Sequence, residues 1–221
     1  METLNNVRFI LASASPRRHD LLCSVGLPHE IVVTDADETP TGICPEGETY
    51  AAWFAEEVSK LKGEAAVADL RVSAGSERVF VISADTVVSP DGVEIYGKPE
   101  DGADAVRMLS ALSGGVHYVV GGITVSEICG GEVRTASRSV VTKVRFKKLS
   151  RAEIDAYVAS GETEGKAGAY AIQGLGGVFV TGVEGDYPNV VGISTSVLFD
   201  MLESEFSLNL FEKSRTIISD R

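Results

Sequence analysis

Two neighbouring arginines follow a proline near the start of the chain and could bind an anion. The stretch LASASPRRHDLL (11–22) sets Arg17 beside Arg18, directly behind Pro16, in a chain whose net charge is −12. A proline is typical of the first position of a helix, where the helix dipole makes each added cation unfavourable by about 0.3–1 kcal/mol. A bound phosphate would reverse that penalty, because backbone N–H groups, the Ser13 hydroxyl and both guanidinium groups would face it. A solvated face paired with a nearby acid is the alternative interpretation.

An aspartate at the end of a predicted buried strand is the candidate catalytic carboxylate. VFVISA (79–84) is a continuous apolar run of strand length, and Asp85 follows it directly. In open α/β sheets, ligands bind beyond the carboxyl ends of the strands. A carboxylate there can hold Mg²⁺ or take a proton from water. The alternative is that Asp85 only caps a turn at Thr86.

Further charged side chains lie in glycine-containing or acidic loops. Lys98 in GKP and Lys166 in EGKAGAYAIQG each stand beside glycine, which lets the backbone approach a ligand closely. A lysine in such a loop can act as a point charge on phosphate. Asp35, Asp37 and Glu38 in TDADETP would suit a hard cation. For that acidic loop on its own, a solvated segment is the favoured interpretation.

These residues fall at the ends of predicted elements that together indicate an α/β fold with a mixed sheet. Strands are predicted at 7–12, 30–34 and 79–84, with a hairpin over 87–96 and a long antiparallel ribbon formed by 116–128 and 133–146. The glycine-rich segment 165–192 is expected to form strand, turn and strand. Helices are predicted at 16–25, 49–70, 101–112, 151–159 and 194–205, with Ser15 capping the first and a Ser150–Glu153 capping box opening the fourth. Parallel-type and antiparallel-type strands with interspersed helices are typical of a mixed sheet.

Composition limits the classes of function. The charge of −12 argues against a general binder of nucleic acid or acidic membranes. Cys23, Cys44 and Cys129 are widely spaced, as are the histidines, so we expect neither a disulfide framework nor a zinc or histidine metal site. The chain has no secretory signal at its start and no apolar run of about 20 residues. We therefore expect a cytoplasmic protein with one domain, residues 1–221.

The motifs, in this order along the chain, resemble the Maf (septum-formation-inhibitor-like) family of nucleotide pyrophosphatases. The resemblance implies hydrolysis of nucleoside triphosphates to the monophosphate and pyrophosphate with a divalent metal, Mg²⁺ or Mn²⁺. It also implies an elongated mixed sheet with flanking helices and two lobes around a central cleft, as in inosine-triphosphatase relatives. The sequence departs from the family at Ser194, where proline is frequent. The matching segments are SASPRRHDLL (13–22), ADTVV (84–88), KP (98–99), KAGAYAIQG (166–174) and NVVG (189–192).

The same resemblance implies roles for individual residues. Asp85 matches the family's catalytic acid, and Glu38, its loop glutamate, would hold the metal together with Asp85. The helix lysine is ambiguous: the count into the following alanine-rich run favours Lys62, whereas the spacing from Tyr50 brings Lys60 closer. The implied substrate-binding set is Ser13, Arg17, Arg18, Lys62, Thr86, Lys98 and Gln173.

Three functional hypotheses stay open at this point. Arg17, Thr86 and Gln173 agree with a subgroup of the family that prefers dTTP and UTP. A second hypothesis is a house-cleaning enzyme that acts on modified or purine nucleotides. A third is a non-catalytic, nucleotide-binding regulator of cell division and septum formation. The implied partner in each case is a nucleotide, a nucleoside triphosphate for the enzymes, and related proteins suggest a homodimer.

Overall fold

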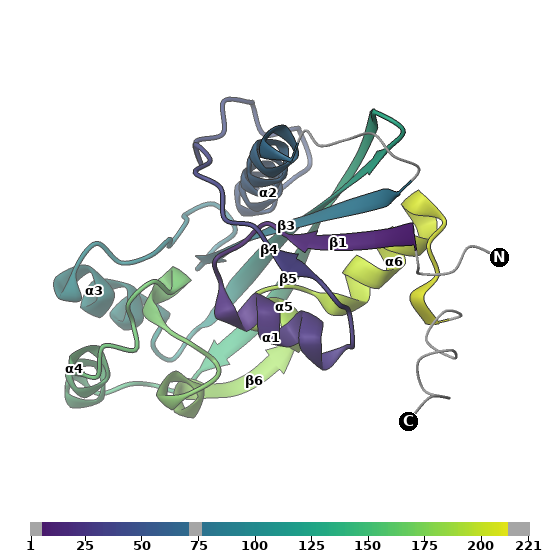
Figure 1. The fold of residues 1–221 in the computed structure, drawn as a ribbon. Coiled ribbons are helices and arrows are strands. Elements are labelled where there is room, and N and C mark those ends of the chain that lie inside the picture. The colour runs from purple at the N-terminus through teal and green to yellow at the C-terminus, as the bar shows by residue number, and fades with distance from the viewer. Residues whose placement is uncertain (1–5, 71–76, 212–221) are drawn as a thin grey trace, which may run out of the picture.

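The computed structural model describes residues 6–70 and 77–211, which form one mixed sheet flanked by helices (Figure 1). Two strands next to β1 run parallel to it, namely β2 and β3, and the remaining neighbours in the order β3-β4-β5-β6 are antiparallel. The predicted α/β fold with a mixed sheet is confirmed. Across the sheet the strands are β2 (Glu30–Ile31), β1 (Val7–Leu11), β3 (Arg78–Ser89), β4 (Val116–Cys129), β5 (Glu132–Phe146) and β6 (Val180–Glu184).

Helices cover both faces of this sheet. In Figure 1, α2 lies on one face, α1, α5 and α6 lie on the other, and α3 and α4 lie together at one end. The Ser150–Glu153 capping box predicted for α4 is present. In 6–70 and 77–211, no helix combines the length and the apolar character that crossing a bilayer requires. The helices are α1 (Pro16–Ser24), α2 (Tyr50–Asp69), α3 (Gly102–Leu112), α4 (Arg151–Ala159), α5 (Tyr187–Val191) and α6 (Thr195–Phe206).

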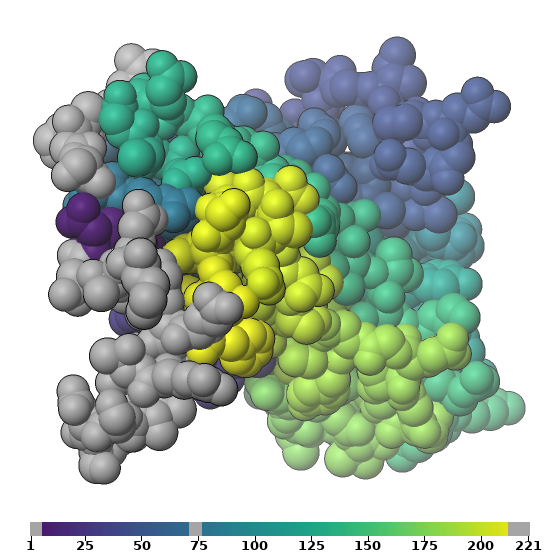
Figure 2. All heavy atoms as spheres, turned by 90° about the vertical axis from the view of Figure 1, so that its right-hand side faces the viewer, coloured from purple at the N-terminus to yellow at the C-terminus, as the bar shows by residue number. Residues whose placement is uncertain are grey.

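Two large hydrophobic clusters lie at opposite ends of the long strands. The first packs Phe80 and Ile82 of β3 against Leu198 of α6. The second packs Val88, at the other end of β3, among side chains of α3 and α4. Figure 2 shows α6, in yellow, beside the β4–β5 hairpin, in green, at the end of the molecule where the first cluster lies. The two clusters agree with the expected two lobes.

Helix α2 approaches the sheet unusually closely because a glycine faces it. A Cβ added to Gly122 of β4 would lie 1.9 Å from the carbonyl oxygen of Ala55, so only glycine fits there. Nearby, the Ser83 hydroxyl donates a hydrogen bond of 2.7 Å to the carbonyl of Ser59. These contacts fix the position of α2 over β3, and therefore the position of Lys62, which α2 carries.

Three local predictions were wrong in whole or in part. The strand expected at 30–34 is paired only at Glu30–Ile31. The hairpin expected at 87–96 is reduced to one antiparallel pair, Val88 with Tyr96, and its first arm is the end of the longer β3. The segment 165–192 contains two 3₁₀ turns before β6, because glycines such as Gly168 (φ +67°) hold left-handed conformations that interrupt a strand. The polar sequence RVSAGSER (71–78) indicates a connector between α2 and β3, and its residues 71–76 lie outside the described residues.

Candidate active site

The turn between β1 and α1 presents Arg18 to the interior of the protein. Its Nη1 donates to the Ser13 hydroxyl at 3.0 Å, its Nη2 to the Thr86 hydroxyl at 3.2 Å, and its Nε to the carbonyl of Gly192 at 2.9 Å. Burial lowers the pKa of Arg18, and the carboxylate of Asp85 acts in the opposite direction. Arg18 thus joins three separate segments of the chain around one point.

Arg17 is held by only one of its nitrogens. Its Nε donates to the carbonyl of Val191 at 3.2 Å, and neither terminal nitrogen has a hydrogen-bond partner among the described residues. Burial lowers the pKa of Arg17, which means that the guanidinium is partly withdrawn from water. Ser15 occupies the N-cap position of α1 but makes no side-chain cap, so the predicted capping role was wrong. The Ser13 hydroxyl accepts the Ser15 N–H instead, at 3.2 Å.

Lys62 lies between the two candidate metal-binding carboxylates. Its Nζ is 2.6 Å from Asp85 Oδ1 and 3.2 Å from Glu38 Oε1. The side chains of Lys62 and Asp85 are 17% and 13% exposed, whereas that of Glu38 is 53% exposed. The Lys62–Asp85 pair is therefore largely shielded from water, whereas the neighbouring Glu38 carboxylate is solvated. Lys60, the alternative lysine, pairs with Glu56 and Glu57.

A buried asparagine anchors the segment that holds both arginines. The Nδ2 of Asn189 lies 3.1 Å from the carbonyls of Val119 and Val140 and from the hydroxyl of Thr142. These acceptors belong to β4 and β5, so the asparagine ties α5 to the middle of the sheet. The carbonyls of Val191 and Gly192, two and three residues after Asn189, accept the hydrogen bonds from Arg17 and Arg18.

One cavity of about 670 Å³ is lined by every residue of the catalytic, metal-binding and substrate-binding sets that the family resemblance implies, but not by Asp35, Asp37 or Lys60. It is lined from both lobes, by the β1–α1 turn, α2 and β3 on one side and by residues 97–98 and 164–173 on the other. Lys98 and Gln173 are exposed, whereas Ser13, Arg18 and Asp85 are partly buried. The predicted residues in the lining are Ser13, Arg17, Arg18, Glu38, Lys62, Asp85, Thr86, Lys98 and Gln173.

The lining also contains groups that were not in the predicted set. Lys166 lines the cavity, and its pKa is lowered by burial and then by the positive charge of Arg17. The sequence had indicated Lys166 as a possible phosphate contact because it stands beside glycine, although the family resemblance did not include it. The carbonyls of Val191 and Gly192 could not have been found in this way, because a backbone acceptor leaves no side-chain signature.

The carboxylates of Glu38 and Asp85 fit a divalent cation. Both approach a single cationic atom, Lys62 Nζ, which places their oxygens around one point. Oxygen ligands from one or two carboxylates, completed by water and substrate phosphates, are the usual set for Mg²⁺. The cavity therefore combines cationic side chains that can bind phosphate with carboxylates that can bind a metal or a water molecule.

Similarity to known proteins agrees with this arrangement. The model of the Maf family, described as "Maf-like protein", matches residues 8–205. A "dTTP/UTP pyrophosphatase" of Mesorhizobium japonicum is 43% identical over 199 residues, which are 90% of this chain and 91% of that protein. Proteins with the same description from Pelotomaculum thermopropionicum and Geobacter metallireducens are 43% and 45% identical, covering 91% and 85% of this chain and 97% and 91% of their own lengths. This chain is a member of the Maf-like family.

Proposed function

We propose that the protein is a nucleoside triphosphate diphosphatase that hydrolyses dTTP and UTP to the monophosphate and pyrophosphate. The main support is the shared cavity, in which Arg17 and Arg18 lie with the carboxylates of Asp85 and Glu38. The relatives described as dTTP/UTP pyrophosphatases, which cover most of the chain, support the choice of substrate. Other or modified nucleotides are a wider substrate class for the same chemistry.

The cationic residues would bind the triphosphate. A triphosphate carries roughly four negative charges near neutral pH, and an acidic protein admits it only where positive charge is concentrated. Arg17 has two terminal nitrogens available, and Lys98 and Lys166 line the opposite wall. Arg18, already bonded to Ser13 and Thr86, contributes a fixed positive field.

The carboxylates would act on the metal and on water. A divalent cation, Mg²⁺ or Mn²⁺, held by Glu38 and Asp85 would neutralise phosphate charge in the transition state. Asp85 orients the attacking water and accepts its proton as the new O–P bond forms at the α-phosphorus. The bond from the α-phosphorus to the bridging oxygen breaks, and pyrophosphate leaves with both electrons of that bond. Lys62 keeps the Asp85 carboxylate in place through the 2.6 Å contact.

Recognition of the base is assigned to the exposed edge of the cavity. Gln173 lines the cavity and is exposed, so its amide can pair with the donor and acceptor groups of a pyrimidine. Thr86 accepts a hydrogen bond from Arg18, so we assign its effect on the substrate to the placement of that guanidinium. We further propose that residues 1–221 act as a single domain in the cytoplasm. The homodimer stays a prediction.

A panel of triphosphates tests this function. Pyrophosphate and monophosphate would be measured with dTTP, UTP, dCTP, CTP, ATP, GTP and 5-methyl-UTP, each with Mg²⁺ and with Mn²⁺. We expect dTTP and UTP to give the highest kcat/KM and the products to be pyrophosphate and monophosphate in equal amounts. Release of orthophosphate would contradict attack at the α-phosphorus. Tight nucleotide binding without turnover would favour the non-catalytic regulator of cell division.

A further inference from the structure

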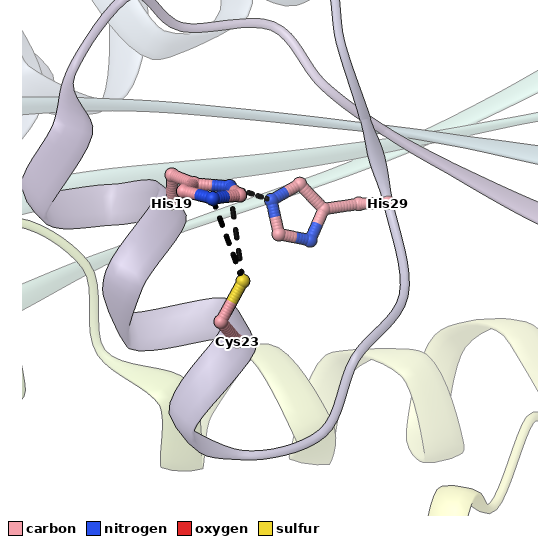
Figure 3. A group of neighbouring side chains, drawn as sticks. All are labelled: His19, Cys23 and His29. Carbon is pink, nitrogen blue, oxygen red and sulfur yellow. Dashed lines mark hydrogen bonds between the residues drawn. The ribbon is translucent and has the colours of Figure 1, made fainter.

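Three potential metal ligands gather at α1, away from the cavity. His19 and Cys23 lie on α1, and His29 lies on the segment that follows it, with the side chains turned toward one another (Figure 3). One ligand atom from each residue lies within 4.8 Å of those of the other two. None of the three lines the cavity. We propose that they form a second metal site, specific for a zinc-class transition metal ion.

The backbone brings these residues together although their sequence spacing is not that of a usual zinc motif. His19 and Cys23 are four residues apart and therefore share one face of α1. The chain then turns at Gly26, whose φ of +71° suits glycine, and the Leu27 N–H bonds to the Leu22 carbonyl at 3.0 Å. This turn returns the chain along α1 and places His29 beside His19. The spacing of these residues in the sequence does not show this return, which is why no histidine metal site was expected from it.

The distances between the ligand atoms are close to those of a tetrahedral site. Nδ1 of His19 lies 2.9 Å from Nε2 of His29 and 3.8 Å from Sγ of Cys23. With metal–nitrogen bonds of about 2.0–2.1 Å and a metal–sulfur bond of about 2.3 Å, tetrahedral ligand atoms stand about 3.4–3.6 Å apart. Small rotations of exposed side chains would supply the difference.

A hydrogen bond outside the site prepares His29 to act as a ligand. Its Nδ1 lies 2.8 Å from the carbonyl oxygen of Leu27, so Nδ1–H donates and the lone pair of Nε2 points toward His19. Metal-binding histidines commonly have such a carbonyl partner on the second ring nitrogen. Binding would replace the His19–His29 hydrogen bond with two metal–nitrogen bonds. His19 would then carry its proton on Nε2, and Cys23 would release its thiol proton to solvent.

The donor set selects the type of metal. Two imidazoles and a thiolate suit Zn²⁺, whereas Mg²⁺ prefers oxygen ligands such as those of Glu38 and Asp85. Cys23 is exposed and both histidines are partly exposed, so an ion can reach the site. Within the described residues no further histidine, cysteine or carboxylate joins the group, which leaves the fourth position to water. The two sites would therefore bind different metals without exchange.

Cobalt provides a direct test, because a cobalt–thiolate bond gives charge-transfer absorption in the near ultraviolet. Tag-free, reduced protein would be titrated with Co²⁺ and then with Zn²⁺, in excess Mg²⁺ to occupy carboxylate sites. We expect the charge-transfer band to appear at one equivalent, to persist in Mg²⁺ and to disappear with Zn²⁺. Cys23→Ser should abolish the band, and His29→Gln should weaken Co²⁺ binding at least about tenfold. Cys44→Ser is the matched control and should keep both the band and the affinity.

A thermal measurement keeps the test independent of catalysis. Because a ligand that binds only the folded state raises Tm, Zn²⁺ should raise the Tm of the unsubstituted chain and of Cys44→Ser but not that of Cys23→Ser. Circular dichroism of each variant without metal establishes that it is folded. A missing charge-transfer band in the unsubstituted chain, or one that survives Cys23→Ser, overturns the proposal. Either result leaves the proposed hydrolysis of dTTP and UTP untouched.

Discussion

Lys62 Nζ lies 2.6 Å from Asp85 Oδ1, so a lysine of α2 holds a carboxylate in the middle of β3. Only 17% of the Lys62 side chain and 13% of the Asp85 side chain are exposed. An ion pair with this little exposure is weakly screened, and loss of either partner leaves a poorly solvated charge. The two residues should therefore be tested separately, because their loss affects different steps of the proposed reaction.

Replacing Asp85 with asparagine should abolish most of the hydrolysis and keep the fold. Asparagine has the same shape but cannot accept the proton of the attacking water, and it is a poorer metal ligand. We expect kcat for dTTP to fall at least ~10²-fold, the scale of a lost general base. Asp200→Asn, an exposed aspartate of α6, is the matched control and should retain normal turnover. Near-normal kcat for Asp85→Asn would remove Asp85 from the mechanism.

Lys62 and Lys60 form a matched pair on α2. Lys62 lines the cavity and pairs with Asp85, whereas Lys60 pairs with acids of its own helix. We expect Lys62→Met to lower kcat/KM for dTTP by ~10²-fold or more, comparable to the loss of one preorganised donor. Lys60→Met should change kcat/KM less than about threefold, since a partly exposed ion pair outside the cavity contributes little. Equal losses in the two variants would indicate a general effect on α2 rather than a role in the cavity.

Substitutions of the two arginines of α1 should differ in their effects: loss of Arg17 should lower activity alone, and loss of Arg18 should lower both activity and stability. Arg17→Ala should lower kcat/KM for dTTP by a factor that corresponds to about 2–4 kcal/mol of lost transition-state stabilisation. The urea concentration at the midpoint of unfolding should stay almost unchanged. Arg18→Ala should lower both, because its three nitrogens bond to Ser13, Thr86 and Gly192. Measurements of kcat/KM and of urea unfolding on the same preparation of each variant test this difference. An Arg17→Ala variant with unchanged kcat/KM would return Arg17 to the solvated-face interpretation.

A buried histidine should make the fold sensitive to acid. Burial lowers the pKa of His117 to about 4, from 6.5 in its ordinary state, and its Nε2 lies 2.9 Å from the Tyr170 hydroxyl. Between these pKa values the unfolded chain binds more protons than the folded chain, so stability present above pH 6.5 is lost as pH falls toward about 4. For this group alone the free energy of unfolding should fall by about 2 kcal/mol between pH 7 and pH 5.

Urea unfolding at pH 7 and pH 5 checks this value. His117→Gln keeps a hydrogen-bonding group near Tyr170 but does not titrate, so the difference between the two pH values should shrink by about 2 kcal/mol. The comparison uses the change with pH and not the absolute stability, since the substitution itself alters packing against Phe146. An identical pH dependence in both proteins would show that His117 is protonated as easily in the folded state as in the unfolded state.

The sequence was sufficient to predict those helices and strands that neighbouring residues specify. The Ser150–Glu153 capping box, the apolar spacing of α3 and the glycine pair between β4 and β5 each specify an element through neighbouring residues. The charged site residues were also found, because Arg17 and Lys98 stand at a helix start and a turn, and Asp85 follows an apolar run. The expectation that Asp85 ends its strand was wrong, since β3 continues past it to Ser89. Lys62 was separated from Lys60 only by the structure, since the choice depends on which face of α2 meets the cavity.

What the sequence could not provide were contacts between distant segments. The carbonyls of Val191 and Gly192 carry no side-chain signal, although they hold both arginines. His19, Cys23 and His29 are brought together by the turn at Gly26, whose geometry is not contained in their spacing. The strand expected over 30–34 ended early, because Ile31 and Val33 remain exposed and gain little from pairing at the edge of the sheet.

The bonds from Arg17 to Val191 and from Arg18 to Gly192 each join residues 174 positions apart. During synthesis on the ribosome, both arginines are made well before the carbonyl groups that hold them. These two contacts cannot form until residue 192 has been added, so a fragment that ends before it would leave both guanidinium groups without these backbone acceptors.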